Sequence, residues 1–152
     1  MGRYAASTSV PVERSQTEIE RTLMRYGADK FAYARDGSRA MIAFSAHGRR
    51  VRFELLLPDI NEFRTTPTGR QRRGGSVDTE WQQACRQRWR SLALSIKARL
   101  AAVEDGIDSF EDAFLSHIVL PSGETVGTWM APQIDKAYIS NRMPALLPAS
   151  CE

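Results

Sequence analysis

The chain has 152 residues, of which 42% are hydrophobic and 26% are charged, and its formal net charge at pH 7 is +3. These proportions are typical of globular proteins and exclude a wholly disordered chain, so we expect a single domain over residues 1–152. No apolar run approaches the roughly 20 residues of a membrane-spanning helix, and no signal-peptide core is present, so we expect a cytoplasmic protein.

The first helix is predicted from a capping motif. Residues 1–14 are small and polar and are expected to form an extended N-terminal segment. The pattern from Ser15 to Glu18 is typical of a capping box, which predicts a helix beginning there and ending near Tyr26, with Ile19 and Leu23 on its buried side. Gly27 provides the stop.

Three antiparallel strands are predicted between residues 30 and 56. A turn at His47-Gly48 places three residue pairs opposite one another: Phe44 with Val51, Ile42 with Phe53, and Ala40 with Leu55. A turn at Asp36-Gly37 places Tyr33 opposite Ala40 and Phe31 opposite Ile42. All of these side chains fall on one face, as a half-buried sheet requires.

The opposite face of this sheet is predicted to be cationic. It carries Lys30, Arg39, Arg50 and Arg52 among small residues, with Glu54 as its acid. Such a face can meet an anionic partner or simply face solvent, and the solvated face is the commoner outcome.

Residues 58–78 lack periodicity and contain prolines, glycines and four arginines, which predicts a mobile basic loop. Asp78 is then a candidate cap for a long helix over about residues 79–105. An apolar stripe runs along that helix: Trp81, Cys85, Trp89, Leu92, Ile96, Leu100 and Val103. We therefore expect Trp89 to be a core residue rather than a base-stacking platform, with arginines on both flanks.

The remaining chain is predicted to hold two short helices. Asp108 and Glu111 resemble a second capping signal, and the last helix falls within residues 125–140 with Trp129, Ile134 and Tyr138 inward. Residues 143–152 form an apolar C-terminal segment that we expect to dock on the body or on a second copy. The predicted fold is α+β: a helix, a three-stranded meander, a long amphipathic helix and two short helices packed on one face.

No catalytic chemistry is apparent. His47 and His117 are far apart in the sequence and match no ligand spacing, and Cys85 is expected to be a buried apolar residue. A reducing compartment disfavours a Cys85–Cys151 disulfide. We therefore expect a protein that is not an enzyme and has no metal or cofactor.

Several segments resemble a family of uncharacterised accessory proteins from tailed bacteriophages and prophages of proteobacteria. The similar segments are VPVERS at 10–15, RYGA at 25–28, RQRWR at 86–90, IKA at 96–98, HIVLP at 117–121 and APQI at 131–134. This resemblance implies an accessory protein of viral origin that acts in a bacterial cytoplasm. It implies no activity and no site residues.

Concentrated arginine is the main indication of function. Only three of the 21 basic residues are lysine, and seven arginines lie between Arg64 and Arg90 against Asp78 and Glu80. Guanidinium groups bind phosphates, so the leading hypothesis is a nucleic-acid-binding protein with little base specificity. The candidate contacts are Arg50, Arg52, Arg64, Arg70, Arg72, Arg73, Arg86, Arg88, Arg90 and Lys97.

Two alternatives remain open at this point. One is a small interaction protein that antagonises a host factor or defence signal, and the other is a phage structural or assembly protein. The arrangement of the arginines distinguishes the leading hypotheses. A polyanion site is favoured if six arginines share one side without intervening acids, and a protein partner is favoured if they scatter: Arg50, Arg52, Arg70, Arg72, Arg86 and Arg90.

Overall fold

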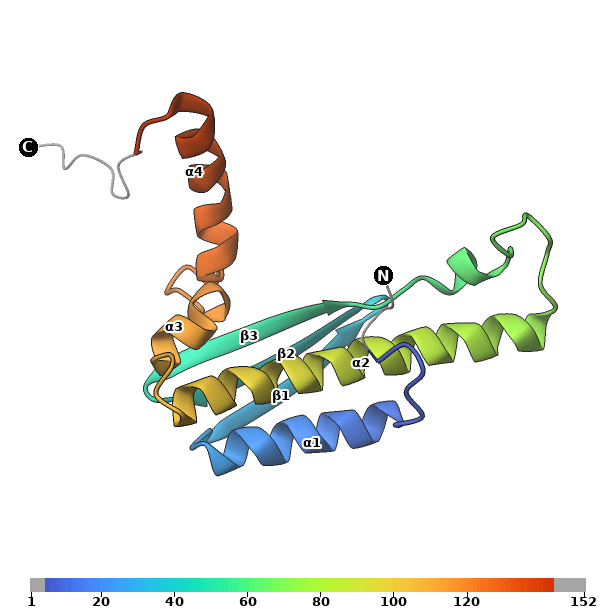
Figure 1. The fold of residues 1–152 in the computed structure, drawn as a ribbon, viewed down its shortest axis with the longest axis horizontal. Helices are drawn as coiled ribbons and strands as arrows, with labels where there is room; N and C mark the ends of the chain where they lie inside the picture. The colour runs from blue at the N-terminus through green and yellow to red at the C-terminus, as the bar shows by residue number, and fades with distance from the viewer. Residues whose placement is uncertain (1–4, 144–152) are drawn as a thin grey trace, which may run out of the picture.

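The computed structural model describes residues 5–143. The elements, in chain order, are α1 (Val12–Arg25), β1 (Lys30–Asp36), β2 (Arg39–Ala46), β3 (Arg49–Leu56), the 3-10 helix η1 (Ile60–Phe63), α2 (Gly74–Glu104), α3 (Phe110–Phe114), the 3-10 helix η2 (Leu115–His117) and α4 (Val126–Ser140) (Figure 1). The predicted α+β class, with a three-stranded antiparallel sheet and one long helix, is confirmed.

Helix α1 begins earlier than the capping motif predicts. Pro11 is the N-cap, with φ −61° and ψ 154°, and its carbonyl accepts a hydrogen bond from the Ser15 amide at 3.1 Å. Ser15 lies inside the helix and is fully buried, so the predicted capping box is wrong and residues 12–14 are helical rather than extended. The reason is that proline fixes φ at a value suited to helix entry.

The end of α1 is as predicted. Gly27 has φ 91°, and the Ala28 amide donates to the Leu23 carbonyl at 3.0 Å, which closes the last turn.

The register of β2 and β3 is confirmed, because Phe44 pairs with Val51, Ile42 with Phe53 and Ala40 with Leu55. The predicted register of β1 is wrong by two residues. Phe31 pairs with Phe44 and Tyr33 with Ile42, so the turn residues are Gly37 and Ser38. Gly37 has φ 54°, and glycine is the residue that suits the first central position of such a turn. A shift of two residues preserves the face of each side chain.

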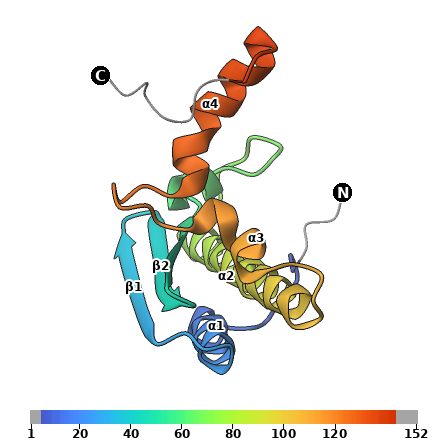
Figure 2. The ribbon, with the colours of Figure 1, turned by 90° about the vertical axis from the view of Figure 1, so that its left-hand side faces the viewer.

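Helices α1 and α2 cover one face of the sheet (Figure 2). Their buried side chains join those of the sheet and α3 in one core, which includes Ile19, Leu23, Ile42, Phe44, Val51, Phe53, Trp89, Ile96, Leu100, Phe110 and Phe114. Trp89 is 4% exposed, which confirms it as a core residue. The other face, called the open face below, carries Lys30, Ala32, Ala34, Asp36, Arg39, Met41, Ala43, Ser45, Arg50, Arg52, Glu54 and Leu56.

The connection between β3 and α2 has more structure than predicted. After η1, a small hairpin is closed by hydrogen bonds from the Arg72 amide to the Arg64 carbonyl at 2.8 Å and from the Thr66 amide to the Arg70 carbonyl at 2.7 Å. Helix α2 then begins at Gly74, five residues before the predicted start, so Asp78 lies within it and is not its cap. The Trp81 indole fixes the connection by donating to the Pro58 carbonyl at 2.9 Å.

Helix α3 is capped by Ser109 rather than Asp108. The Ser109 hydroxyl accepts from the Asp112 amide at 3.0 Å and donates to the Asp112 carboxylate at 2.7 Å. The cap is one residue later than predicted because Gly106, with φ 71°, ends α2 and leaves Asp108 in the connecting turn. Phe110 and Phe114 are buried, as the pattern predicts.

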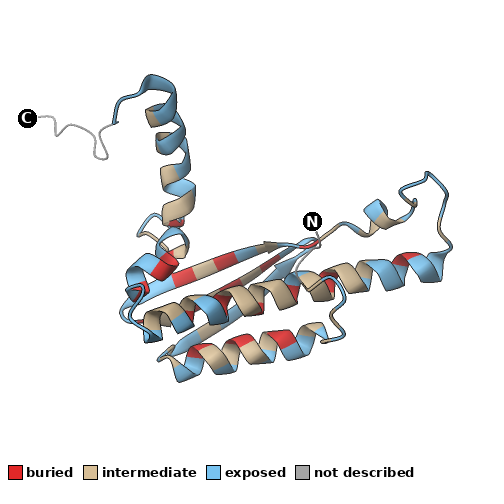
Figure 3. Cartoon of the chain, viewed as in Figure 1, coloured by how far each residue is buried: buried red, intermediate tan, exposed pale blue. Residues whose placement is uncertain are grey.

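Helix α4 leads away from the body of the molecule (Figure 1) and contains no buried residue (Figure 3). The prediction that Trp129, Ile134 and Tyr138 face inward is therefore wrong. Three strands about 4.8 Å apart form a sheet only about 10–15 Å wide, and two helices about 10 Å in diameter already cover it. No room is left for α4 on that face.

Candidate functional site

The ten cationic residues predicted to bind nucleic acid lie in three separate regions. Arg50 and Arg52 are on the open face of the sheet. Arg64, Arg70, Arg72 and Arg73 are in and beside the hairpin that precedes α2. Arg86, Arg88, Arg90 and Lys97 are on α2, which packs on the opposite side of the sheet from the open face. The residues do not share one side, so they do not form a single cationic surface.

The open-face arginines differ in their contacts. Arg52 donates from Nη1 to the Gly123 carbonyl at 2.9 Å, and its Nε lies 3.3 Å from Oε1 of Glu54. Arg50 is exposed, and its carbonyl accepts a hydrogen bond from the Val119 amide at 2.8 Å. Arg52 therefore joins the sheet to the turn before α4, whereas Arg50 is exposed.

Two of the α2 cations have structural contacts. The Arg90 guanidinium lies 2.5 Å from the Glu18 carboxylate of α1. Arg86 donates to the side-chain oxygen of Gln83, whose amide in turn donates to the Ala6 and Thr8 carbonyls at 3.1 and 2.9 Å. These two arginines thus help to hold the N-terminal segment and α1 against α2, while Arg88 and Lys97 are exposed.

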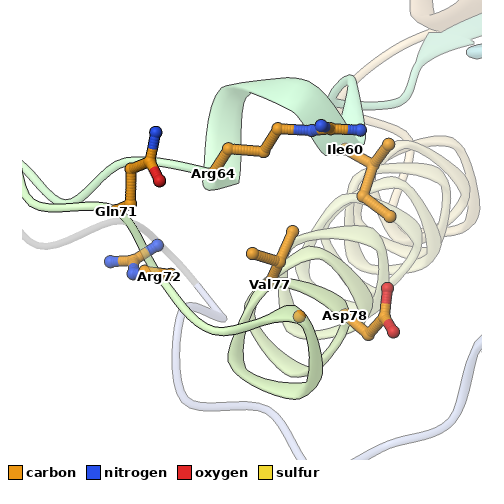
Figure 4. A pocket seen from close by; sticks show the side chains of 7 residues that line it. Ile60, Arg64, Gln71, Arg72, Val77 and Asp78 are labelled. Carbon is orange, nitrogen blue, oxygen red and sulfur yellow. The ribbon is translucent and has the colours of Figure 1, made fainter.

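A pocket of about 400 Å³ lies between η1, the hairpin and the start of α2 (Figure 4). Arg64 and Arg72 line it, but their guanidinium groups lie toward opposite ends, and Asp78 contributes an acid to its wall. Within residues 5–143, none of Arg64, Arg70, Arg72 and Arg73 forms an ion pair. The pocket is therefore cationic, but its two guanidinium groups do not point toward a common centre.

The surface of α4 was not predicted as a site. Trp129 is 36% exposed, Ile134 47%, Tyr138 86% and Ile139 88%. Single exposed apolar residues are ordinary, but several on one projecting helix are typical of an interaction surface. The sequence contained one indication of this exposed surface, because the apolar sides of α1 and α2 are together sufficient to cover a three-stranded sheet.

The base of α4 is firmly attached to the body. The Thr125 hydroxyl caps the helix by accepting from the Thr128 amide at 3.2 Å. Gly127 packs so closely on η2 that a Cβ there would lie 2.9 Å from the Ser116 carbonyl oxygen. The helix ends at Asn141, which has φ 50°. The projection of α4 is therefore fixed at its first turn.

The histidines have packing contacts. His117 stacks on Phe53 with ring centres 4.0 Å apart, and His47 lies 4.7 Å from the Phe110 ring. Burial lowers the pKa of His117, the Arg99 charge lowers it further, and a backbone hydrogen bond with Arg52 acts in the opposite direction. Burial likewise raises the pKa of the Cys85 thiol. The part of the chain that the structure describes contains no group of three metal-ligating side chains.

No protein-family model, curated protein or solved structure matches this chain. The resemblance to phage accessory proteins therefore stays a prediction from the sequence. Among the helices of residues 5–143, none is both long and apolar enough to cross a membrane. The predicted docking of the C-terminal segment and the state of Cys151 lie outside the described residues.

Proposed function

We propose that this protein is a non-enzymatic interaction protein that presents α4 to a protein partner. The observation that carries the proposal is that α4 is fixed at its base yet has no buried residue and exposes large apolar side chains along its length. Ile134 and Tyr138, four residues apart, lie on one side of this helix, and such a side is suited to entering a groove of another protein.

The exposed apolar area is large enough to drive binding. Tyr138 and Ile139 are 86% and 88% exposed. Covering both removes roughly 300 Å² from water, which is worth about 7 kcal/mol before the costs of association are subtracted. Trp129 lies nine residues before Tyr138, on the opposite side of the helix, so it does not belong to this contact.

A photo-crosslinking amino acid at position 138 tests this proposal in cells that express the full chain. We expect discrete protein adducts at position 138 and none at a matched exposed position, Ser122, which lies in the turn before α4. Equal labelling at both positions, or no adduct at position 138, would contradict the proposal.

Nucleic-acid binding is the second candidate, and it is supported by a different observation. Residues 64–73 contain four arginines and no acid, and none of the four is ion-paired in the described part of the chain. Phosphate contacts through such a segment bind without base specificity and weaken steeply with salt. Affinities for DNA and RNA at two salt concentrations test it, and no binding at low salt would remove it.

The source implied by the sequence resemblance suggests classes of partner for α4. A phage accessory protein would meet a bacterial host protein, another phage protein or a second copy of itself. An antagonist role and an assembly role both require such a contact.

A further inference from the structure

The outer edge of β1 is uncovered, whereas the opposite edge of the sheet is closed. The chain that follows η2 covers the edge of β3, because the Val119 amide donates to the Arg50 carbonyl at 2.8 Å and Val51 pairs with Ile118. Within residues 5–143, the backbone of β1 is hydrogen-bonded to β2 alone. None of its residues is buried, and all but one are exposed. One edge of the sheet is therefore available to a further strand.

The pairing shows which backbone groups of β1 point outward. Hydrogen-bonded and non-hydrogen-bonded pairs alternate along an antiparallel ladder, and the pair that closes a two-residue turn is hydrogen-bonded. In this hairpin the closing pair is Asp36 with Arg39. The amides and carbonyls that point away from β2 are therefore those of Phe31, Tyr33 and Arg35. A strand added at this edge would meet main-chain donors and acceptors along its whole length.

The middle of β1 lacks the features by which proteins usually protect an edge strand. These features are proline, a bulge, a very short strand or a charge at the centre. The strand has seven residues with the uncharged run 31–34 and no proline, and its pairing with β2 is unbroken from Lys30 to Asp36. Helix α1 lies on the helix side of the strand, where the Tyr33 hydroxyl donates to the Gln16 carbonyl at 2.7 Å. In Figure 2, β1 is the outermost strand of the sheet.

The sequence of β1 is complementary to itself. When two copies of the strand run antiparallel with their Tyr33 residues opposite each other, Lys30 of each copy lies opposite Asp36 of the other. Arg35 of each copy then lies opposite the Phe31 ring of the other, an arrangement that favours a cation–π contact. The three residues whose backbone groups point outward pair with one another, as the hydrogen bonds of an added strand require.

Other registers lose this match. An antiparallel pair centred on Lys30, Arg35 or Asp36 places like charges directly opposite each other, which is destabilising. A pair centred on Ala32 or Ala34 places both end charges opposite uncharged residues. The register centred on Tyr33 is also the one that pairs all seven residues of the strand.

The neighbouring charges leave this match in place. Arg39 lies beside Asp36 on β2, two strand spacings or about 10 Å from Lys30 of the other copy, so their repulsion is screened at physiological salt. The β2 neighbour of Lys30 is Ser45, and the charged residues of β3 are one strand farther away. On the helix side, the charge of Glu20 acts on the Tyr33 hydroxyl, so an acid accompanies the arginines there.

We propose that the β1 strands of two copies pair antiparallel about Tyr33, which joins their three-stranded sheets into one continuous sheet in a twofold dimer. Such a contact is isologous, because the same surface of each copy supplies both halves. The proposal goes beyond the proposed function, since it concerns the edge of the sheet and leaves α4 free for its own partner.

Charge reversal at the two ends of β1 tests the dimer in the purified full chain. Lys30→Glu places two acids opposite each other, and Asp36→Lys places two cations opposite each other, so each variant repels itself. Combining both substitutions in one chain restores the two ion pairs with reversed sign. Arg50→Glu is the matched control, because Arg50 is exposed on β3 at the other edge of the same face. Sedimentation velocity over a dilution series measures the dimer dissociation constant, and circular dichroism checks folding.

We expect the wild type, the control and the double variant to dimerise alike. The dissociation constant of each single variant should rise roughly 10- to 100-fold, because two attractive pairs become repulsive. An equimolar mixture of Lys30→Glu with Asp36→Lys should form mixed dimers as tightly as the wild type, since each contact again joins a lysine to an acid.

Hydrogen exchange identifies the surface that is used. The amides of Phe31, Tyr33 and Arg35 should exchange severalfold more slowly above the dissociation constant than below it. A wild type that is monomeric throughout the dilution series, or single variants that dimerise as tightly as the wild type, would overturn the inference. In either case, adducts at position 138 would still support the proposed function.

Discussion

Arg52 on the central part of β3 donates a hydrogen bond to the Gly123 carbonyl, 71 residues later, at 2.9 Å. This contact ties the sheet to the turn from which α4 projects. Arg52 was expected to be a phosphate ligand, and its position instead makes it part of the base that holds α4. The close packing of Gly127 on Ser116 completes that base.

Gly127→Ala should loosen the first turn of α4. The added Cβ would lie 2.9 Å from the Ser116 carbonyl oxygen, so the helix or η2 must move. We expect faster amide hydrogen exchange over residues 126–131 with little change in the core helices. Ala131→Gly, on the exposed part of the same helix, is the control for helix propensity alone. Unchanged exchange in Gly127→Ala would show that the base of α4 is not close-packed.

Trp89→Ala should lower the free energy of unfolding by about 3–5 kcal/mol, because it empties a large site in the core. Trp89 is 4% exposed and lies 6.2 Å from the Tyr33 ring. Arg88→Ala at the exposed neighbouring position should change the free energy by no more than about 0.5 kcal/mol. Chemical denaturation measures both. A small effect of Trp89→Ala would instead be consistent with a surface role for the ring.

His117→Phe should make the protein less sensitive to mild acid. The folded state holds His117 with a lowered pKa, caused mainly by burial, so it binds a proton less readily than the unfolded chain does. The stability from the neutral imidazole is fully present above the unfolded pKa of about 6.5 and is lost as pH falls below it, through the folded pKa.

Phenylalanine keeps the stacking on Phe53 but has no proton to bind. The free energy of unfolding of His117→Phe should therefore fall less than that of the wild type between about pH 7 and pH 5. Urea denaturation at both pH values measures the difference. An equal fall in the two proteins would show that His117 does not contribute to acid sensitivity.

Arg70→Gln with Arg73→Gln tests the second candidate function. If these exposed arginines bind phosphates, affinity for a DNA oligonucleotide should fall and the salt slope should decrease by roughly one per arginine. Arg14→Gln with Arg21→Gln removes the same charge from exposed positions of α1 and should have a smaller effect. Equal losses in the two double variants would indicate general charge attraction rather than a site in residues 64–73.

The sequence predicted the core well because periodicity reports burial directly. The stripe of α2, the pairing of β2 with β3 and the stop at Gly27 are all local patterns with one dominant physical cause. The errors lie where two signals compete. Pro11 was a stronger helix start than the motif at Ser15, and Gly37 took the first rather than the second turn position.

The candidate site could not be predicted from such patterns. An apolar side chain on α4 carries no local signal of whether it will be buried, and only the width of the sheet decides that α4 has no place on it. Similarly, clustering of arginines in the sequence did not mean clustering in space. The meander and the long helix separate Arg50 from Arg86, and Glu18 comes from another element to pair with Arg90.

Hydroxyl-radical footprinting of Tyr138 most directly tests the claim that α4 binds another protein. The labelling rate is compared between the dilute purified protein and the same full chain in cells that express it, with the exposed Met24 as an internal reference. We predict that Tyr138 is labelled rapidly in the dilute protein and is protected severalfold in cells, while Met24 is labelled alike in both. Equal labelling of Tyr138 under the two conditions would contradict the account.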